Sequence, residues 1–355
     1  MTTPDTAAPG RHRPVAVEFV LLNALYHQGV ESIAVKHPCE GIGELVQITL
    51  ENDGQATVRF TQGTMTYQDN REAIPAKHGE PADNDLPDAE TYTRTMIASG
   101  HVPLNNHDAV KEFIQRHGYA DLEAGHDPVV LGVDANIIAW RLPEVLGIDS
   151  ETGATDDRDR RPTNGYALAT GVKEELDWHF KQYNTHELTK AFGEEFARLD
   201  NQPAGANREG FLGLYEYRRL RTNRTADIIE CDTGDEAIVT AYKEYNQNSR
   251  KQAVLLGNDH GFVERSIDAG VPAQHIDYPI DIPRKATDSW TQAAELLYYL
   301  AILFGVIRLP KVSVYGVWNG KDGRHWQHEQ LDLDCRSPKI EPHLERDLTI
   351  LGATY

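Results

Sequence analysis

The stretch "VVLGVDANIIAW", residues 129–140, places one carboxylate directly after a run of apolar side chains. Residues 129–133 are apolar on both faces, which is typical of a buried strand in a parallel sheet. Asp134 ends this strand, and the residues after it have helical character. Ligands of open α/β sheets lie just beyond the carboxyl ends of the strands, but Asp is also a favoured helix N-cap. The stretch therefore predicts an α/β fold and leaves both interpretations of Asp134 open.

Downstream of this stretch, strand patterns alternate with helix patterns. Alternation of this kind is typical of a parallel sheet with right-handed crossovers. We expect strands over residues 166–170, 251–259 and 273–278, and helices over 171–183, 186–199, 235–248 and 262–270. Residues 150–165 read as an exposed insertion between the first two strands.

The chain of 355 residues divides into three expected parts: an N-terminal α+β module over 1–125, a parallel-sheet core over 126–281, and a C-terminal helix and β-hairpin extension over 282–355. The first part begins with a polar tail over residues 1–12. Its other expected elements are a helix over 15–29, a hairpin over 43–63, an exposed loop over 73–91 and a helix over 107–118. The role of this module is not evident from its residues, and a second copy of the chain or another protein is an open alternative for its partner.

The charge balance is strongly acidic. The 55 acidic residues outnumber 35 basic ones, which gives a net charge of −20, and only 12 of the 35 basic residues are lysine. An acidic, lysine-poor surface indicates a halophilic protein that works in concentrated salt. Negative charge disfavours non-specific attraction to nucleic acid or to an anionic membrane. That objection weakens at high ionic strength, because the Debye length at 1 M salt is only about 3 Å.

The cysteine pattern and the hydropathy indicate a soluble, cytoplasmic protein. Cys39, Cys231 and Cys335 are far apart and form neither a disulfide framework nor a zinc ribbon. The first residues contain no apolar signal core, and the apolar stretch 296–307 is shorter than the roughly 20 residues of a membrane span. We therefore expect no membrane partner.

Four acids are expected at one edge of the parallel sheet. Asp134 and Asp259 end apolar strands, whereas Glu175 and Asp235 lie in the first turns of helices. Each acid alone is explained as a helix cap or dipole partner. Together they would repel one another by several kcal/mol, so such a cluster calls for a cation. Oxygen-only ligands suit Mg²⁺ or Mn²⁺ rather than zinc, and such an ion activates water and neutralises charge on a phosphate.

In chain order, the stretches "VVLGVDANII", "YALATGVKEEL", "GDEAIVTA" and "AVLLGNDHGFVERSIDAGV" resemble the acidic motifs of PIN-domain nucleases. The resemblance covers roughly residues 129–278. It implies a PIN-like Rossmannoid core flanked by helices and a metal-dependent ribonuclease activity, most simply endonucleolytic, on RNA, with DNA not excluded. It further implies the metal ligands and catalytic residues Asp134, Glu175, Asp235 and Asp259, with Asn136, Asn258 and Asp232 as supporting groups.

Two glycines depart from the family's pattern. Gly257 stands where the family has a Ser or Thr hydroxyl two residues before the last Asp, and Gly261 stands where a second Asp is common. Asp232 could substitute in part. These departures leave open a catalytically inactive PIN-like module that binds RNA or protein. A haloacid-dehalogenase-like phosphatase is a weaker alternative, because its second acid would stand at Asn136.

The run "YEYRRLRTNRT", residues 215–225, is the only dense basic run in the sequence. Guanidinium groups bind phosphates and stack on bases, so one interpretation is a nucleic-acid contact beside the acidic site. The alternative is a helix face that pairs with the acids of this chain. The candidate RNA-binding residues are Arg218, Arg219, Arg221 and Arg224.

Overall fold

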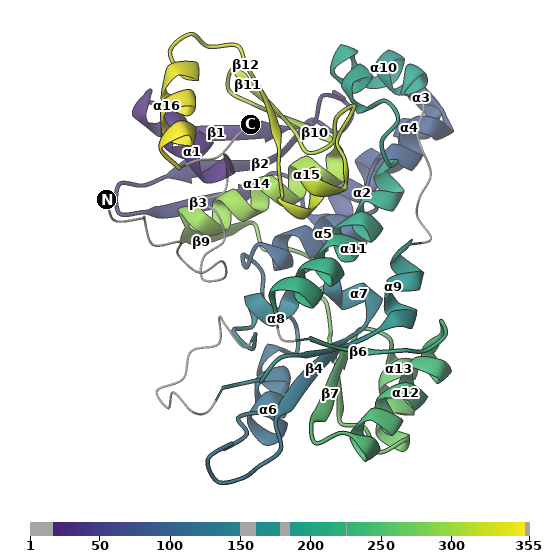
Figure 1. The fold of residues 1–355 in the computed structure, drawn as a ribbon. Helices are drawn as coiled ribbons and strands as arrows, with labels where there is room; N and C mark the ends of the chain where they lie inside the picture. The colour runs from purple at the N-terminus through teal and green to yellow at the C-terminus, as the bar shows by residue number, and fades with distance from the viewer. Residues whose placement is uncertain (1–16, 150–160, 178–184, 225, 352–355) are drawn as a thin grey trace, which may run out of the picture.

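The computed structural model describes residues 17–149, 161–177, 185–224 and 226–351. It is a mixed α/β fold with two sheets, a seven-stranded antiparallel sheet in the upper half of Figure 1 and a five-stranded parallel sheet in the lower half. The expected tail over 1–12, residues 150–160 of the expected insertion and the end of the expected helix over 171–183 lie outside the described residues.

The parallel sheet has the strand order β6-β5-β4-β7-β8, with β4 at its centre. All five residues of β4 are buried, as the apolar run predicts. β4 and β7 start level with each other, since Val129 pairs with Gln252, and so do β5 and β6, since Tyr166 pairs with Ala226. β5 starts two residues later than β4, because Tyr166 pairs with Leu131. The strands are β4 (Val129–Val133), β5 (Tyr166–Ala169), β6 (Ala226–Ile229), β7 (Gln252–Gly257) and β8 (Ala273–His275). The expected parallel α/β sheet is confirmed.

The helices of this region follow the expected alternation. The expected helix over 235–248 has the predicted bounds, whereas the one over 186–199 is broken at Gly193, whose φ of +112° suits only glycine. They are α7 (Ala135–Ile138), α8 (Leu142–Val145), α9 (Thr170–Asp177), α10 (His186–Phe192), the 3₁₀ helix η1 (Glu194–Leu199), α11 (Gly205–Asn223), α12 (Asp235–Asn248) and α13 (His260–Asp268).

The antiparallel sheet is built from both ends of the chain. Its order is β12-β11-β10-β1-β2-β3-β9, so β1 pairs with β10 and β3 pairs with β9. Its strands are β1 (Ser32–Lys36), β2 (Glu44–Leu50), β3 (Gln55–Phe60), β9 (Lys285–Ser289), β10 (Val306–Leu309), β11 (Val312–Tyr315) and β12 (Asp332–Cys335). The first and third parts expected from sequence are thus joined in one sheet, and the C-terminal hairpin extends that sheet.

The exposed loop expected over 73–91 is wrong, because short helices occupy most of it. Each of the first two has proline in its first turn, where no intrahelical N–H is needed. The region buries Ile74, Ala82 and Leu86. Its mostly polar composition therefore led to the wrong expectation, because these few apolar side chains pack into the core. The helices of the antiparallel part are α1 (Val17–His27), α2 (Thr64–Glu72), α3 (Ile74–His78), α4 (Glu80–Asp85), α5 (Ala89–Ala98), α6 (His107–His117), α14 (Trp290–Phe304), α15 (Gly323–Gln327) and α16 (Glu341–Leu351).

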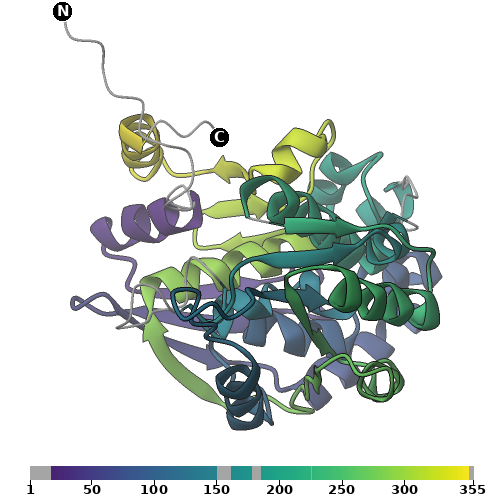
Figure 2. The same ribbon diagram turned by 60° about the horizontal axis from the view of Figure 1, so that its bottom comes forward.

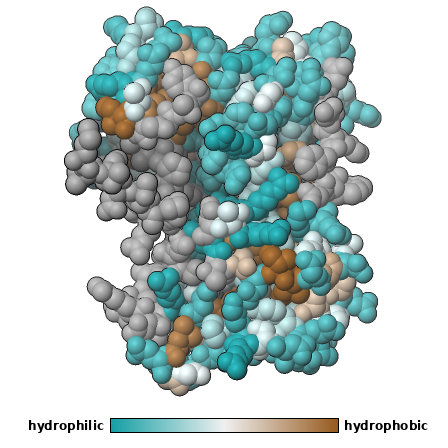
Figure 3. Space-filling view, in the orientation of Figure 1, coloured by the Kyte–Doolittle hydropathy of each residue, from teal (hydrophilic) through white to brown (hydrophobic). Residues whose placement is uncertain are grey.

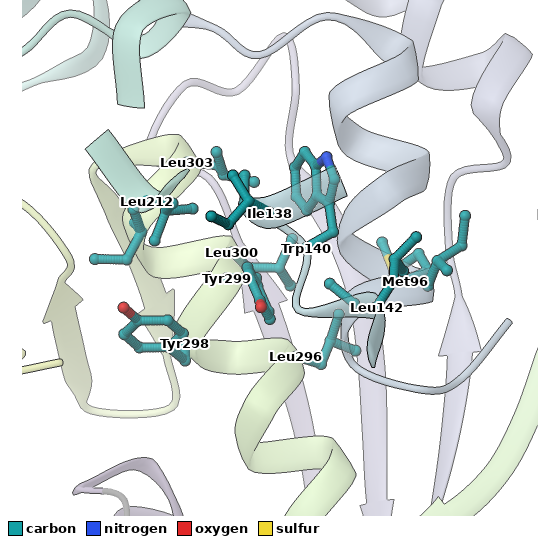
Figure 4. Close-up of a cluster of buried hydrophobic side chains, with 14 of the residues drawn as sticks. Met96, Ile138, Trp140, Leu142, Leu212, Leu296, Tyr298, Tyr299, Leu300 and Leu303 are labelled. Atoms are coloured by element: carbon teal, nitrogen blue, oxygen red, sulfur yellow. The ribbon is translucent and has the colours of Figure 1, made fainter. Parts of the chain in front are cut away.

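The two sheets share one hydrophobic core, which Figure 4 shows in part. Met96 of α5, Ile138 of α7 and Leu296 of α14 belong to the same buried cluster. Trp140, which follows α7, is fully buried with its ring 6.0 Å from that of Tyr299 on α14. Figure 2 brings the parallel sheet and its helices forward and shows the arrangement of the elements from another side. The relative placement of the two sheets is therefore fixed by packed side chains.

The surface is in keeping with the composition. The face in Figure 3 carries mostly hydrophilic side chains, with apolar ones in small patches. Within the described ranges, no helix combines the length and the apolar character needed to cross a membrane.

Candidate active site

Asp134 is both a helix cap and a buried carboxylate at the carboxyl end of the central strand. It is the N-cap of α7, and its Oδ1 accepts a hydrogen bond from the backbone N–H of Ala135 at 2.7 Å. The residue is only 8% exposed. A capping role alone does not require burial, since N-caps are ordinarily solvated. The two interpretations that the sequence left open are therefore compatible.

Glu175 lies on α9, the helix after β5, and Asp235 begins α12, the helix after β6. β5 and β6 are adjacent strands of the parallel sheet. Glu175 is half-buried on α9, and its Oε1 accepts from the backbone N–H of Gly234 at 3.2 Å. Gly234 has a φ of +96° and immediately precedes Asp235 at the start of α12. The loop after β6 is thus tied to α9, which brings Glu175 and Asp235 to the same edge of the sheet.

The pKa values show that three of these carboxylates interact. The pKa of Asp134 is raised to about 6, chiefly by burial, while the Ala135 N–H opposes the shift and the charges of Glu175 and Asp235 add to it. The pKa of Glu175 is also raised, first by burial and further by the charge of Asp235. Negative charge therefore accumulates at the carboxyl edge of the sheet.

Asp259 lies at the end of β7 and is more exposed than Asp134. It is the N-cap of α13, with Oδ1 accepting from the backbone N–H of Phe262 at 3.0 Å. Arg265, on the same helix, donates from Nη2 to Oδ2 of Asp235 at 2.6 Å. Arg265 thus links α13 to the carboxylate of α12 and partly neutralises the edge.

The four carboxylates have the oxygen ligands and the negative charge that suit a divalent cation. Their positions in the structure, however, do not form a metal site. Carboxylate oxygens are the ligands that Mg²⁺ and Mn²⁺ prefer. Among the described residues, no three His, Cys, Asp or Glu side chains gather closely enough to hold a metal ion. Arg265 occupies Oδ2 of Asp235 and therefore competes with a cation for that carboxylate.

The supporting residues take different positions. The side chain of Asn136 hydrogen-bonds to Asp134 and lowers the pKa of that carboxyl, against the larger effect of burial. Asn258 donates from Nδ2 to the carbonyl of Ile276 at 2.8 Å, so its amide is directed to the strand after α13. Asp232 is exposed, and its backbone oxygen lies so close to Gly171 that a Cβ there would come within 2.4 Å.

Two residues of the site, Thr170 and His275, were not singled out from sequence. Thr170 begins α9 directly after β5, and its Oγ1 accepts from the N–H of Cys231 at 2.9 Å, which fixes the loop that leads to Asp235. His260 and His275 stack with their ring centroids 3.7 Å apart beside Asp259. Thr170 follows directly on a predicted strand, so its position was a usable signal. The stacking of the histidines depends on the pairing of β7 with β8, for which the sequence carries no local signal.

The two departures from the PIN pattern have different surroundings. A Cβ at Gly257 would lie 2.7 Å from Cδ1 of Phe262, so the packing of α13 against β7 leaves no room for a hydroxyl-bearing side chain. A Cβ at Gly261 would lie 3.1 Å from Oδ1 of Asp259 and 3.0 Å from the flexible tip of Arg265. Packing therefore requires glycine at position 257, whereas a side chain at position 261 can be accommodated if the tip of Arg265 moves.

The C-terminal end of the basic run and the carboxylates lie at opposite edges of the parallel sheet. The run leads into Ala226, the first residue of β6, so its C-terminal end lies at the amino edge of the sheet. Tyr217, earlier in the run, lies within electrostatic reach of Glu230 and Cys231, which follow β6 at the carboxyl edge. Arg219 pairs with Glu216 at 2.6 Å and with Glu144.

The remaining arginines of the run differ in exposure. Arg224 pairs with Glu144 at 3.7 Å and with Asp149 at 3.5 Å. Arg218 lies over the ring of Tyr215 at 4.9 Å, and Arg221 is exposed. Ion pairing within the chain therefore accounts for Arg219 and Arg224, while a nucleic-acid contact stays a prediction.

A cavity of about 330 Å³ lies elsewhere, between the end of α5, α8 and α14. Its lining is mostly apolar and includes none of the four carboxylates. The carboxyl edge of the parallel sheet is thus a separate feature, at which Glu175 and Asp235 are half-buried and Asp259 is exposed. Such an edge is accessible to a long substrate without a closed pocket.

Comparison of the chain with protein-family models, curated protein sequences and solved structures gives no match. The residues at the carboxyl edge of the parallel sheet and their geometry are therefore the basis for assigning a function.

Proposed function

We propose that this protein is a metal-dependent nuclease with a PIN-like core and that it hydrolyses RNA phosphodiester bonds. One observation carries the proposal: the buried carboxylate of Asp134 ends the central strand, and its pKa is raised to about 6 by burial and further by the charges of Glu175 and Asp235. A cation is the simplest counter-charge for acids held together in this way. Perturbed carboxyls at the carboxyl edge of a parallel sheet also mark the usual place of a functional site.

In this proposal Asp134, Asp235 and Asp259 hold Mg²⁺ or Mn²⁺, and Glu175 either ligates the ion or orients the attacking water. When bound, such an ion lowers the pKa of water and neutralises the charge that develops on the phosphate. The chain contributes fixed positions: the Ala135 N–H orients Asp134, and the Gly234 N–H orients Glu175. An ordered carboxylate loses less freedom on binding an ion than a mobile one.

The exposure of Asp259 and the half-buried positions of Glu175 and Asp235 leave the edge accessible to a polymer, which favours a polymer as the substrate. RNA is the proposed partner, and DNA is a second substrate to be tested beside it. The net charge of −20 repels a polyanion at low ionic strength, so we propose that the protein works in a salt-rich cytoplasm where this repulsion is screened.

The test is cleavage of a labelled mixed RNA pool, and of a matched DNA pool, in concentrated potassium chloride. Reactions contain Mn²⁺, Mg²⁺ or chelator, with the wild type, Asp134→Asn and Asp268→Asn. Asp268 is exposed at the last turn of α13, so its variant removes the same charge outside the site. Metal-dependent cutting that is lost only in Asp134→Asn supports the proposal.

A second candidate is a PIN-like module that binds RNA or protein without cutting. It is favoured by Gly257, where packing excludes the family's hydroxyl, and by the ion pair of Arg265 with Asp235. In that case the folded wild type binds RNA without any metal and cuts neither pool. Hydrolysis of p-nitrophenyl phosphate in place of RNA would instead favour the phosphatase alternative.

A further inference from the structure

Arg94 connects the N-terminal half of the chain to the carboxyl edge of the parallel sheet. It lies on α5, is only 8% exposed and donates from Nη2 to Oδ1 of Asn258 at 3.3 Å. Asn258 directly precedes Asp259 in the sequence. A side chain from the helix layer beneath the antiparallel sheet therefore contacts the residue next to one of the four carboxylates.

The same guanidinium also reaches the loop after the central strand, through an aromatic ring. Arg94 lies over the ring of Tyr278 with its Cζ 4.7 Å from the centroid. Tyr278 in turn donates its hydroxyl hydrogen to the backbone oxygen of Asn136 at 3.2 Å. Asn136 lies two residues after Asp134, so Arg94 is coupled to both strand ends, β4 and β7.

Arg94 is itself held in place by two carboxylates. It pairs with Glu209 of α11 at 3.4 Å and with Glu90 one turn earlier on α5. Thr91 donates to Glu209 at 3.0 Å and orients that carboxylate. The opposite side of α5 contributes Met96 to the shared core, so the helix that presents Arg94 is anchored by packing.

We propose that Arg94 is a positioning residue of the active site, which holds the Asp134 and Asp259 strand ends in register with each other. This inference rests on the proposed nuclease function. A planar guanidinium with several donors can hold an amide oxygen, a carboxylate and an aromatic face at once, whereas a lysine holds fewer partners. The N-terminal half of the chain thereby forms part of the site, so residues 126–281 alone lack a residue that the site needs.

A purely structural role for Arg94 predicts a different outcome, and a matched arginine separates the two. Arg71 of α2 is 20% exposed at its side chain and pairs with Asp83 at 3.2 Å. Both Arg71 and Asp83 belong to the N-terminal segment. Arg71→Met therefore removes a partly buried ion pair from the same half of the molecule at a site distant in sequence from the carboxyl edge. Loss of stability alone would affect both variants alike.

The experiment compares the full-length wild type with Arg94→Met, Arg94→Lys, Tyr278→Phe and Arg71→Met, at a temperature where all five are folded. RNA cleavage gives kcat and KM, and hydrogen exchange reports the amides of residues 134–138 and 258–262. We expect Arg94→Met to lower kcat by about 10- to 100-fold with KM changed less than about 2-fold, because misplaced groups affect the transition state. Arg94→Lys should recover part of this loss, and Tyr278→Phe should cost about 3-fold.

Exchange at both segments should accelerate in Arg94→Met and stay at the wild-type rate in Arg71→Met. If Arg94→Met matches Arg71→Met in kcat and in exchange, the inference is overturned while the nuclease stands. If the wild type cuts no RNA, the proposed function fails instead. In that case hydrogen exchange alone decides whether Arg94 holds the two strand ends. Exchange in Arg94→Met at the wild-type rate would overturn the positioning role of Arg94 too.

Discussion

Arg265 donates a hydrogen bond from Nη2 to Oδ2 of Asp235 at 2.6 Å, so a guanidinium neutralises one of the four carboxylates at the edge of the sheet. The side chain of Arg265 is 54% exposed, and an exposed pair of this kind contributes at most about 1 kcal/mol. The pair is therefore strong enough to compete with a cation and weak enough to be displaced by one.

From this pair we expect Arg265→Gln to bind Mn²⁺ about 3- to 5-fold more tightly than the wild type, as measured by titration calorimetry. The control is Arg250→Gln, an exposed arginine that precedes β7 at the amino edge of the sheet. It changes the net charge equally, so an equal gain in both variants would assign the effect to overall charge.

Asp134→Asn should stabilise the metal-free protein at neutral pH. The folded pKa of Asp134, about 6, lies above the ordinary Asp pKa of 3.8 that applies to the unfolded chain, so ionisation costs stability. That cost is absent below about pH 4, grows up to about pH 6 and is then constant at no more than about 3 kcal/mol. Asn keeps the cap without the charge. Urea unfolding at pH 8 and pH 4 should show a gain at pH 8 only, and Asp268→Asn should show none at either.

Binding of Mn²⁺ should weaken in acid, because the proton and the metal ion compete for Asp134. With a folded pKa of about 6, the apparent affinity should fall by about 10-fold per pH unit below pH 6 and level off above it. Titration at pH 5, 6, 7 and 8 measures this. An affinity that is constant between pH 5 and pH 7 would show that Asp134 is not a ligand.

Two neighbouring arginines of the basic run should differ sharply in their effect on stability. Arg219 is 12% exposed at its side chain and pairs with Glu216 and Glu144, so Arg219→Met should lower the free energy of unfolding by about 3 kcal/mol. Arg221 is exposed, and Arg221→Met should change it by less than about 0.5 kcal/mol. RNA affinity of Arg221→Met then tests the predicted nucleic-acid contact without a folding defect.

Restoring the family's hydroxyl at Gly257 should harm the protein. A Cβ there would lie 2.7 Å from Phe262, so Gly257→Ser should cost about 1–3 kcal/mol in denaturant unfolding. Gly261→Ala is the matched change in the first turn of α13, where the tip of Arg265 can move aside, and it should cost nothing measurable. A stable Gly257→Ser with raised activity would contradict the packing argument.

The sequence by itself determined the parallel sheet and the edge at which the acids lie. A run such as residues 129–133 has only one way to bury both faces, and Asp134, Asp235 and Asp259 follow strands or open helices within a few residues. Local patterns of this kind are decided by neighbours in the chain, which is why the strands β4, β5 and β7 and the helix α12 were predicted closely.

Only the tertiary structure decided which distant segments meet. The pairing of β1 with β10, the contact of Arg94 with Asn258 and the ion pair of Arg265 with Asp235 join residues between 30 and 272 positions apart. No local pattern encodes such contacts, because they depend on how the two sheets pack through α5, α11 and α14. The same packing placed the C-terminal end of the basic run at the amino edge of the parallel sheet, opposite the strand ends that the acids follow.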